Sequence, residues 1–170
     1  RIELALLDGR VAQAAAVLEA HQAAEDERPR IPAESLLQWA DVRLQLARND
    51  ATGAAQAAGV LVRAMKDAGV VATWNLVIAQ EWAALAAAEA GLDDRAAALL
   101  DEAATTRGLI SPPSRVELAD SELRRAQSLL KLGKPAQARQ LARSALDKLT
   151  NQHPNSPRLR MARRIAAPPE

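Results

Sequence analysis

The stretch Gly-Lys-Pro-Ala-Gln-Ala at residues 133–138 decides the fold, because its pattern recurs along the chain. The same pattern occurs in Gly-Arg-Val-Ala-Gln-Ala at 9–14 and in Gly-Leu-Asp-Asp-Arg-Ala at 91–96. At 49–54, the stretch Asn-Asp-Ala-Thr-Gly-Ala has Asn in place of the first Gly. After Gly, Asn best tolerates the left-handed backbone conformation that ends many helices. The stretches begin at positions 9, 49, 91 and 133, so the spacing between them is nearly constant. This regular period indicates a repeat protein.

The composition favours helices and removes several kinds of site. Ala and Leu, two strong helix formers, account for 40 and 24 of the 170 residues, and Tyr and Phe are absent, which disfavours all-β and doubly wound α/β folds. The absence of Cys excludes disulfides, thiolate zinc sites, iron–sulfur clusters and cysteine nucleophiles. Because only two His are present, we expect no metal and no cofactor. No run of 18 apolar residues occurs, so we expect no membrane span.

Apolar residues recur at three-to-four spacing on both sides of each repeated stretch, which predicts a helical hairpin around each turn. The expected helices cover residues 1–7 and 10–25, 33–48 and 51–68, 73–90 and 93–107, 114–132 and 135–151, and finally 157–166. Ser156 as N-cap and Pro157 in the first turn predict the start of the last helix. Gly69 and Gly108, each followed by a hydrophobic residue, predict Schellman-type helix ends.

These elements predict one domain over residues 1–170. We expect an all-α, right-handed solenoid of antiparallel helix hairpins, with an irregular helical bundle as the alternative. The hairpins are expected at 1–25, 33–68, 73–107 and 114–151, and the polar, Arg-rich helix 157–166 is expected to cap the array. The chain begins with Arg1 and a very short first helix, so we expect it to be part of a longer protein.

The repeated stretches also resemble the turn and second helix of a tetratricopeptide repeat (TPR). There a Gly is followed by Ala five residues on, with small or apolar residues four and seven places further. The matching residues are Gly133, Ala138, Ala142 and Ala145, with Ala126 on the first helix, and Gly91, Ala96, Leu100 and Ala103, with Ala84. The first hairpin departs from this pattern at His21, and the second departs at Asn49 and Leu61.

The period is longer than the usual ~34 residues of a TPR. Hairpins of this length, especially residues 33–107, resemble the variant repeats of MalT-like, LuxR-type bacterial transcription activators, where they form a sensor region. Residues 115–164, with His153 before Pro154, also resemble the helical-repeat tails of bacterial Ser/Thr kinases. The resemblance implies a cytoplasmic, bacterial signalling or transcription-regulatory protein, and it specifies a fold rather than an activity.

Nothing in the sequence points to catalysis. P-loop, dinucleotide-binding, zinc-protease and nucleophile-elbow motifs are absent. His21 and His153 are separate, and we interpret them as a half-buried structural residue and a loop residue. Asp93 and Asp94 lie at an expected helix start, where negative charge favours the helix dipole, so we expect capping rather than acid–base chemistry. We therefore expect no enzyme and no catalytic residues.

The candidate binding surface follows from the repeat register. The only aromatic residues are Trp39 and Trp82 on first helices and Trp74 at a helix start; such a Trp either fills the core or anchors a partner. Trp39 takes a position that faces the concave groove, and Glu81 and Leu123 are its equivalents in the next two repeats. One turn later the set is Arg43, Leu85 and Gln127, and Lys131 lies near the basic end. We predict these seven residues as the partner-binding surface.

The net charge of +1 hides an asymmetry. Residues 1–123 carry 11 basic and 19 acidic residues, for −8, whereas residues 124–170 carry 11 basic and 2 acidic residues, for +9. We expect these segments to form opposite poles of the array, without neutralising each other. A predicted basic patch consists of Arg139, Arg143, Arg160, Arg163 and Arg164.

The sequence is compatible with three classes of function. A non-catalytic scaffold whose groove holds a protein, a peptide or a small regulatory ligand is favoured, because helical arrays present extended concave surfaces. In the alternative, the basic C-terminal end contacts nucleic acid or an acidic partner domain. Nucleic acid is disfavoured because no aromatic residue for base stacking follows Trp82. An enzyme is the weakest hypothesis.

Overall fold

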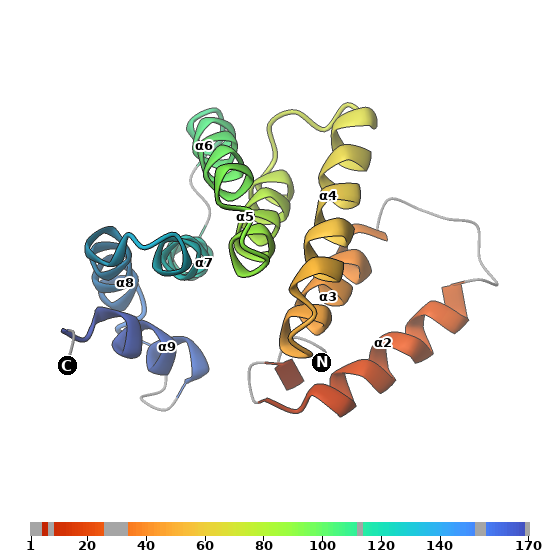
Figure 1. Cartoon of the computed structure of the whole chain (residues 1–170), viewed down its shortest axis with the longest axis horizontal. Coiled ribbons are helices and arrows are strands. Elements are labelled where there is room, and N and C mark those ends of the chain that lie inside the picture. Colours follow the sequence, from red (N-terminus) through yellow and green to blue (C-terminus); the bar gives the residue numbers. More distant parts are fainter. Residues whose placement is uncertain (1–4, 7–8, 26–33, 112–113, 152–155, 169–170) are drawn as a thin grey trace.

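A computed structural model describes residues 5–6, 9–25, 34–111, 114–151 and 156–168, and between residues 21 and 38 it describes only the backbone of the helices. Every regular element of this described part is an α-helix, so the all-α prediction is confirmed (Figure 1). The helices are α2 (Val11–Glu25), α3 (Glu34–Ala47), α4 (Ala51–Asp67), α5 (Trp74–Glu89), α6 (Asp93–Gly108), α7 (Arg115–Lys131), α8 (Pro135–Lys148) and α9 (Pro157–Ala166). Within the same residues, no helix is both long enough and apolar enough to cross a membrane.

The four repeated stretches form tight turns between consecutive helices. Gly9, Gly91 and Gly133 have φ of 74°, 72° and 67°, and Asn49 has φ of 61°, so all four adopt the left-handed conformation. The turn at Gly91 is of the Schellman type, since Leu92 N donates to Ala87 O at 2.8 Å and Gly91 N donates to Ala88 O at 3.2 Å. The predicted turns at these four positions are confirmed.

Two further glycines behave differently from each other. Gly69 has φ of 77°, and Val70 N donates to Met65 O at 3.0 Å, so the predicted Schellman end of α4 is confirmed. The same prediction for Gly108 is wrong, because α6 includes Gly108 and ends at Leu109 with φ of −96°. Leu109 N and Ile110 N donate to the carbonyls of Thr106 and Arg107, so this helix ends without a left-handed residue.

The remaining boundaries agree to within a residue or two, with one exception. α8 ends at Lys148 rather than at 151, because the amide of Leu149 already turns back onto the carbonyls of Ala145 and Leu146. The start of α9 is confirmed: Ser156 accepts a hydrogen bond from Leu159 N at 3.3 Å, and Pro157 occupies the first turn. Most of the predicted helix 1–7, the side chain of His21, and His153 lie outside the described residues.

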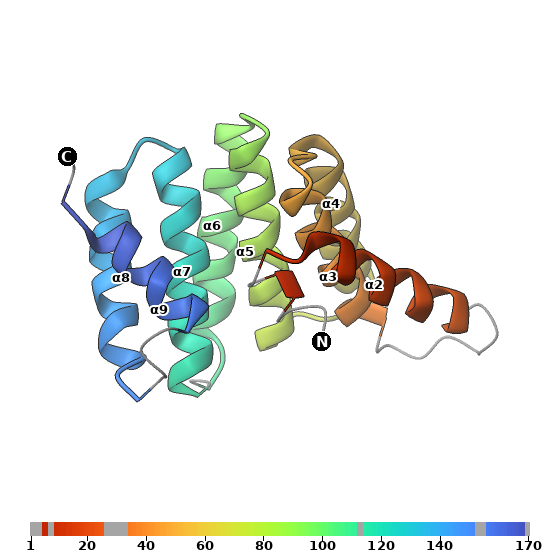
Figure 2. The same cartoon turned by 90° about the horizontal axis from the view of Figure 1, so that it is seen from below.

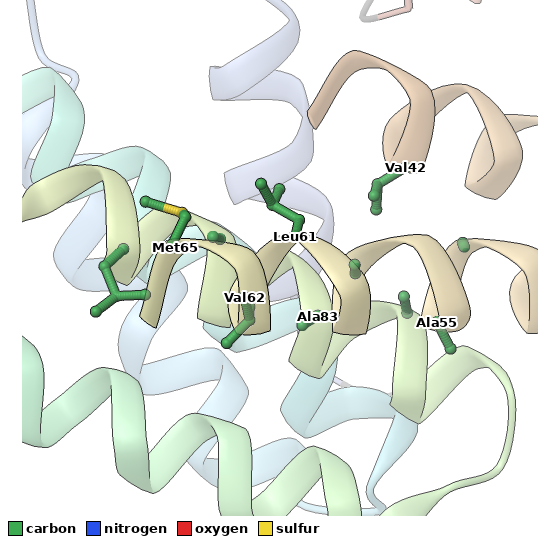
Figure 3. Close-up of a cluster of buried hydrophobic side chains, with 11 residues drawn as sticks. Val42, Ala55, Leu61, Val62, Met65 and Ala83 are labelled. Atoms are coloured by element: carbon green, nitrogen blue, oxygen red, sulfur yellow. The ribbon is translucent and has the colours of Figure 1, made fainter. Parts of the chain in front are cut away.

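Alanines bring the helices close together at the centre of the molecule. α5 packs against α3, α4, α6 and α7. Its residues Ala83, Ala84, Ala86 and Ala87 are at most 2% exposed, and their small side chains let neighbouring backbones approach from several directions. Figure 3 shows the larger core cluster, in which Val42, Leu61, Val62 and Met65 gather with Ala83 of α5.

Two helices cross the others on one side of the molecule. In Figure 1, α3 to α8 form an arc, with α2 and α9 below its two halves. Figure 2 looks onto this side, and shows α9 lying across α7 and α8. Leu159, Ala162 and Ile165 of α9 are buried against that pair, so α9 covers α8 as the predicted cap would but also lies on the inner side of the arc.

Candidate binding groove

A groove of about 760 Å³ is lined by residues of α3, α5, α7 and α9, together with Leu6, Asn49 of the turn before α4 and Ala51 at the start of α4. The described residues that line it are Leu6, Arg43, Leu46, Ala47, Asn49, Ala51, Trp82, Leu85, Glu89, Gln127, Lys131, Pro157, Arg160, Met161 and Arg164. Its size is typical of sites that bind small molecules or short peptide segments.

One of the two sets of repeat-equivalent residues predicted for the partner-binding surface lines this groove. Arg43, Leu85 and Gln127 come from α3, α5 and α7, and each follows the previous one by one repeat period. Lys131, one turn beyond Gln127, also lines it and pairs with Glu89 across α5 and α7 at 2.7 Å. Equivalent positions of three successive repeats therefore meet along one continuous surface.

The other register set does not line the groove, so that part of the predicted surface is wrong. Glu81 is 0% exposed and Leu123 is 3% exposed, and Leu123 packs in a core cluster with Leu149 and Leu159. Trp39 is half-buried against the cluster around Val42. These residues lie one turn nearer the start of each helix, where Glu81 and Leu123 contact neighbouring helices; Leu85 is also mostly covered, at 4% exposure, although it lines the groove.

Glu81 is instead the centre of a buried polar cluster. Its carboxylate accepts hydrogen bonds from Ser121 Oγ, from Arg124 Nε at 3.0 Å and from Arg107 Nη1 at 3.3 Å. Arg124 also places Nη2 at 2.9 Å from Glu81 Oε2, so this arginine contacts the carboxylate through two nitrogens. The cluster joins α5, α6 and α7, and it satisfies a charge that would otherwise be costly to bury.

A third cationic side chain, that of Arg125, lies beside this cluster. Burial, followed by the positive charge of Arg107, lowers the pKa of the Arg125 guanidinium, while Glu81 and Glu122 act in the opposite direction. An arginine keeps its charge at neutral pH even so. This part of α7 therefore holds two adjacent positive charges, those of Arg124 and Arg125, beside the carboxylate of Glu81.

Trp82 belongs to the groove, although the predicted partner-binding surface does not contain it. The guanidinium of Arg43 lies 5.1 Å from the centroid of its ring, and that of Arg124 lies 5.8 Å away, within cation–π range. Trp82 and Arg124 lie one repeat period apart in the sequence, so they are equivalent positions of adjacent repeats. The sequence did contain a signal for this contact, because an aromatic and a cationic residue lie one repeat period apart.

The predicted basic patch is divided by the fold. Arg160 and Arg164 lie one turn apart on α9, are exposed, and line the groove. Arg163 lies on another side of α9, and Arg139 and Arg143 lie on α8; none of these three lines the groove. Two of the five basic residues therefore join the repeat-register residues, and three do not.

Among the described residues, no three His, Asp or Glu lie close enough together to hold a metal ion. Asp93 and Asp94 lie in the first turn of α6 and are exposed, where they favour the helix dipole. The N-cap itself is Leu92, so neither carboxylate caps the helix by a hydrogen bond.

Comparison with known proteins returned no relative. No protein-family model matches the chain, and no curated protein or solved structure matches it significantly.

Proposed function

We propose that this chain is a non-catalytic interaction scaffold whose groove binds a protein segment or a small regulatory ligand. The observation that carries the proposal is the convergence of Arg43, Leu85 and Gln127, three register-equivalent residues, on one groove of about 760 Å³. Repeat arrays use such extended concave surfaces for recognition. Cationic, apolar and amide side chains are all present in the lining, which suits recognition.

The finer architecture is part of this proposal. The regularly spaced left-handed turns and the neighbouring packing of α3 to α8 support a right-handed, TPR-like solenoid of antiparallel hairpins. The resemblance to the repeats of MalT-like, LuxR-type activators supports a cytoplasmic role in bacterial signalling or transcription regulation. A repeat tail of a bacterial Ser/Thr kinase is the alternative parent protein.

A steric block tests whether the groove binds anything. Ala47 is an exposed residue that lines the groove, so Ala47→Trp should fill it without disturbing the core. Ala98 is exposed on α6 outside the groove, and Ala98→Trp is the matched control. The labelled proteins are applied to an array of immobilised short peptides and to a panel of small metabolites.

The proposal expects ligands that the unmodified chain and Ala98→Trp bind and that Ala47→Trp fails to bind. Ligands lost equally in both variants, or no ligand in either panel, would contradict it. DNA binding that Ala47→Trp leaves intact, and that falls steeply with salt, would favour the alternative in which the basic end contacts nucleic acid.

A further inference from the structure

Positive charge dominates the described lining of the groove. Four of its residues are cationic, and Glu89 is the only acidic one. The cationic residues are Arg43, Lys131, Arg160 and Arg164. Within this lining the carboxylate of Glu89 lies against Lys131, so the summed charge of the lining residues stays positive.

α9 supplies the cationic side of the groove in a fixed orientation. Leu159, Ala162 and Ile165 are at most 6% exposed and hold one face of the helix against α7 and α8. Arg160 and Arg164, one turn apart, share the face that lines the groove. Because the buried face fixes the rotation of the helix, these two guanidiniums are presented together to the groove that Lys131 also lines.

The opposite side of the groove is mainly apolar. Leu6, Leu46, Ala47 and Ala51 line it there, and Leu85 lies between the two sides on α5. Three of the four cations therefore lie on α7 and α9, whereas aliphatic side chains prevail toward the end of α3; there Arg43 is the one cation of the described lining, and it lies over the ring of Trp82. An occupant that matches both sides must carry negative charge at one side and apolar groups at the other.

The polar groups in the lining favour a peptide over a nucleic acid. Asn49 and Gln127 each offer an amide, which can both donate to and accept from a peptide main chain. The only aromatic ring in the described lining is that of Trp82, which two guanidiniums already contact, so it is poorly placed to stack on a base.

We propose that the groove recognises a short acidic peptide segment in one orientation, with its carboxylates toward Lys131, Arg160 and Arg164 and its apolar side chains toward Leu46 and Leu85. This inference rests on the proposed function, since it names the class of ligand for the same groove. Arg160 and Arg164 determine the specificity for negative charge, and the aliphatic side determines the orientation.

The test uses short fluorescein-labelled peptides and fluorescence anisotropy on the full chain. One peptide carries an acidic stretch followed by leucines; a second replaces its acidic residues by their amides, and a third replaces its leucines by serines. The double variant Arg160→Glu/Arg164→Glu removes the cationic side. Its control is Arg139→Glu/Arg143→Glu on α8, which has the same spacing and the same change in net charge outside the groove. Thermal unfolding checks that each variant is folded.

The acidic, leucine-containing peptide should bind more tightly than either replacement. The α9 double variant should weaken this binding by about tenfold or more, and the α8 control by no more than about twofold, because long-range charge effects are screened. Equal loss in both double variants would overturn the inference, as would failure of the acidic peptide to bind. If the amide peptide binds equally well and Ala47→Trp blocks it, the proposed function stands while the specificity for acidic segments is wrong.

Discussion

Ala138 shows how a single small residue sets the distance between two helices. It is 0% exposed and packs with Ala126, Ala142 and Ile165, so α7, α8 and α9 meet at this point. Ala96, its equivalent in the preceding hairpin, is also 0% exposed. No side chain larger than a methyl group fits between backbones that approach in this way.

Ala138→Leu should therefore overpack the contact and lower the free energy of unfolding by about 1–3 kcal/mol. Ala136→Leu is the control, because Ala136 is exposed on the same helix. Denaturant unfolding measures both. Equal stability of the two variants would show that the helices separate more easily than the packing implies.

Glu81 and Glu89 form a natural pair for measuring the effect of burial on an ion pair. Both lie on α5 and contact cations of α7, but the side chain of Glu81 is 0% exposed and that of Glu89 is 33% exposed. Glu81→Gln should destabilise the chain by about 3 kcal/mol, because it leaves Arg124 without its carboxylate in a buried site. Glu89→Gln should cost at most about 1 kcal/mol.

Thermal or denaturant unfolding distinguishes the two variants. Similar losses in both would mean that water reaches the cluster around Glu81, contrary to its burial. A double variant that also replaces Arg124 by Leu should recover part of the loss, because it removes the more buried of the two arginines that contact Glu81.

At the scale of the element, the turns between helices depend on backbone conformation alone. A Cβ at Gly91 would meet no atom within 4 Å, so the only cost of a side chain there is its positive φ. Gly91→Ala should lower the free energy of unfolding by about 1 kcal/mol. Asn49→Gly should change it in the opposite direction, because Asn49 bears a side chain at φ of 61°. If both substitutions destabilise, contacts of the Asn49 side chain matter more than its backbone strain.

These elements also show how far the sequence predicts the structure. The turns at Gly9, Asn49, Gly91 and Gly133 were predictable because helix termination is a local property of a few residues. The end of α6 was not, since Gly108 permits a left-handed conformation without requiring one, and the helix continues through it. A glycine thus permits a helix to end, and the hydrogen bonds of the following residues determine whether it does.

The groove was predictable only in part, for a different physical reason. The register placed Arg43, Leu85 and Gln127 on one surface, because equivalent residues of stacked helices align. Whether a residue is buried depends on how closely neighbouring helices pack, so the register alone did not reveal that adjacent helices cover Glu81 and Leu123. The contribution of α9 depends on its docking against α7 and α8, which no local pattern encodes.

At the scale of the whole molecule, the fold modifies the expected separation of charge. Among the described residues, ion pairs join the acidic segment 1–123 to the basic segment 124–170 at Glu81–Arg124, Glu89–Lys131, Asp120–Arg158 and Glu122–Lys148. The two segments therefore neutralise each other where they meet, contrary to the expectation of fully separate poles. Two further cations of the basic segment, Arg160 and Arg164, lie on the groove side of α9.

This residual asymmetry predicts weak, salt-sensitive self-association. The acidic segment of one copy should be attracted to the cationic side of the groove in another, and exposed charges are screened beyond roughly 8–10 Å at physiological salt. Sedimentation velocity at high protein concentration should show association at low salt that disappears as salt is raised. Arg160→Glu/Arg164→Glu should abolish it, and Arg139→Glu/Arg143→Glu should reduce it less.

The outcome also bears on what occupies the groove. A monomer at both salt concentrations would mean that the acidic segment does not reach the groove, which leaves the groove to a different acidic partner. Association that persists at high salt would have an apolar origin, and the exposed side chains of Val71 and Leu109, at 75% and 69% exposure, are where such an interface would be sought. Val71→Ser and Leu109→Ser would then weaken it, while the charge variants of α9 would not.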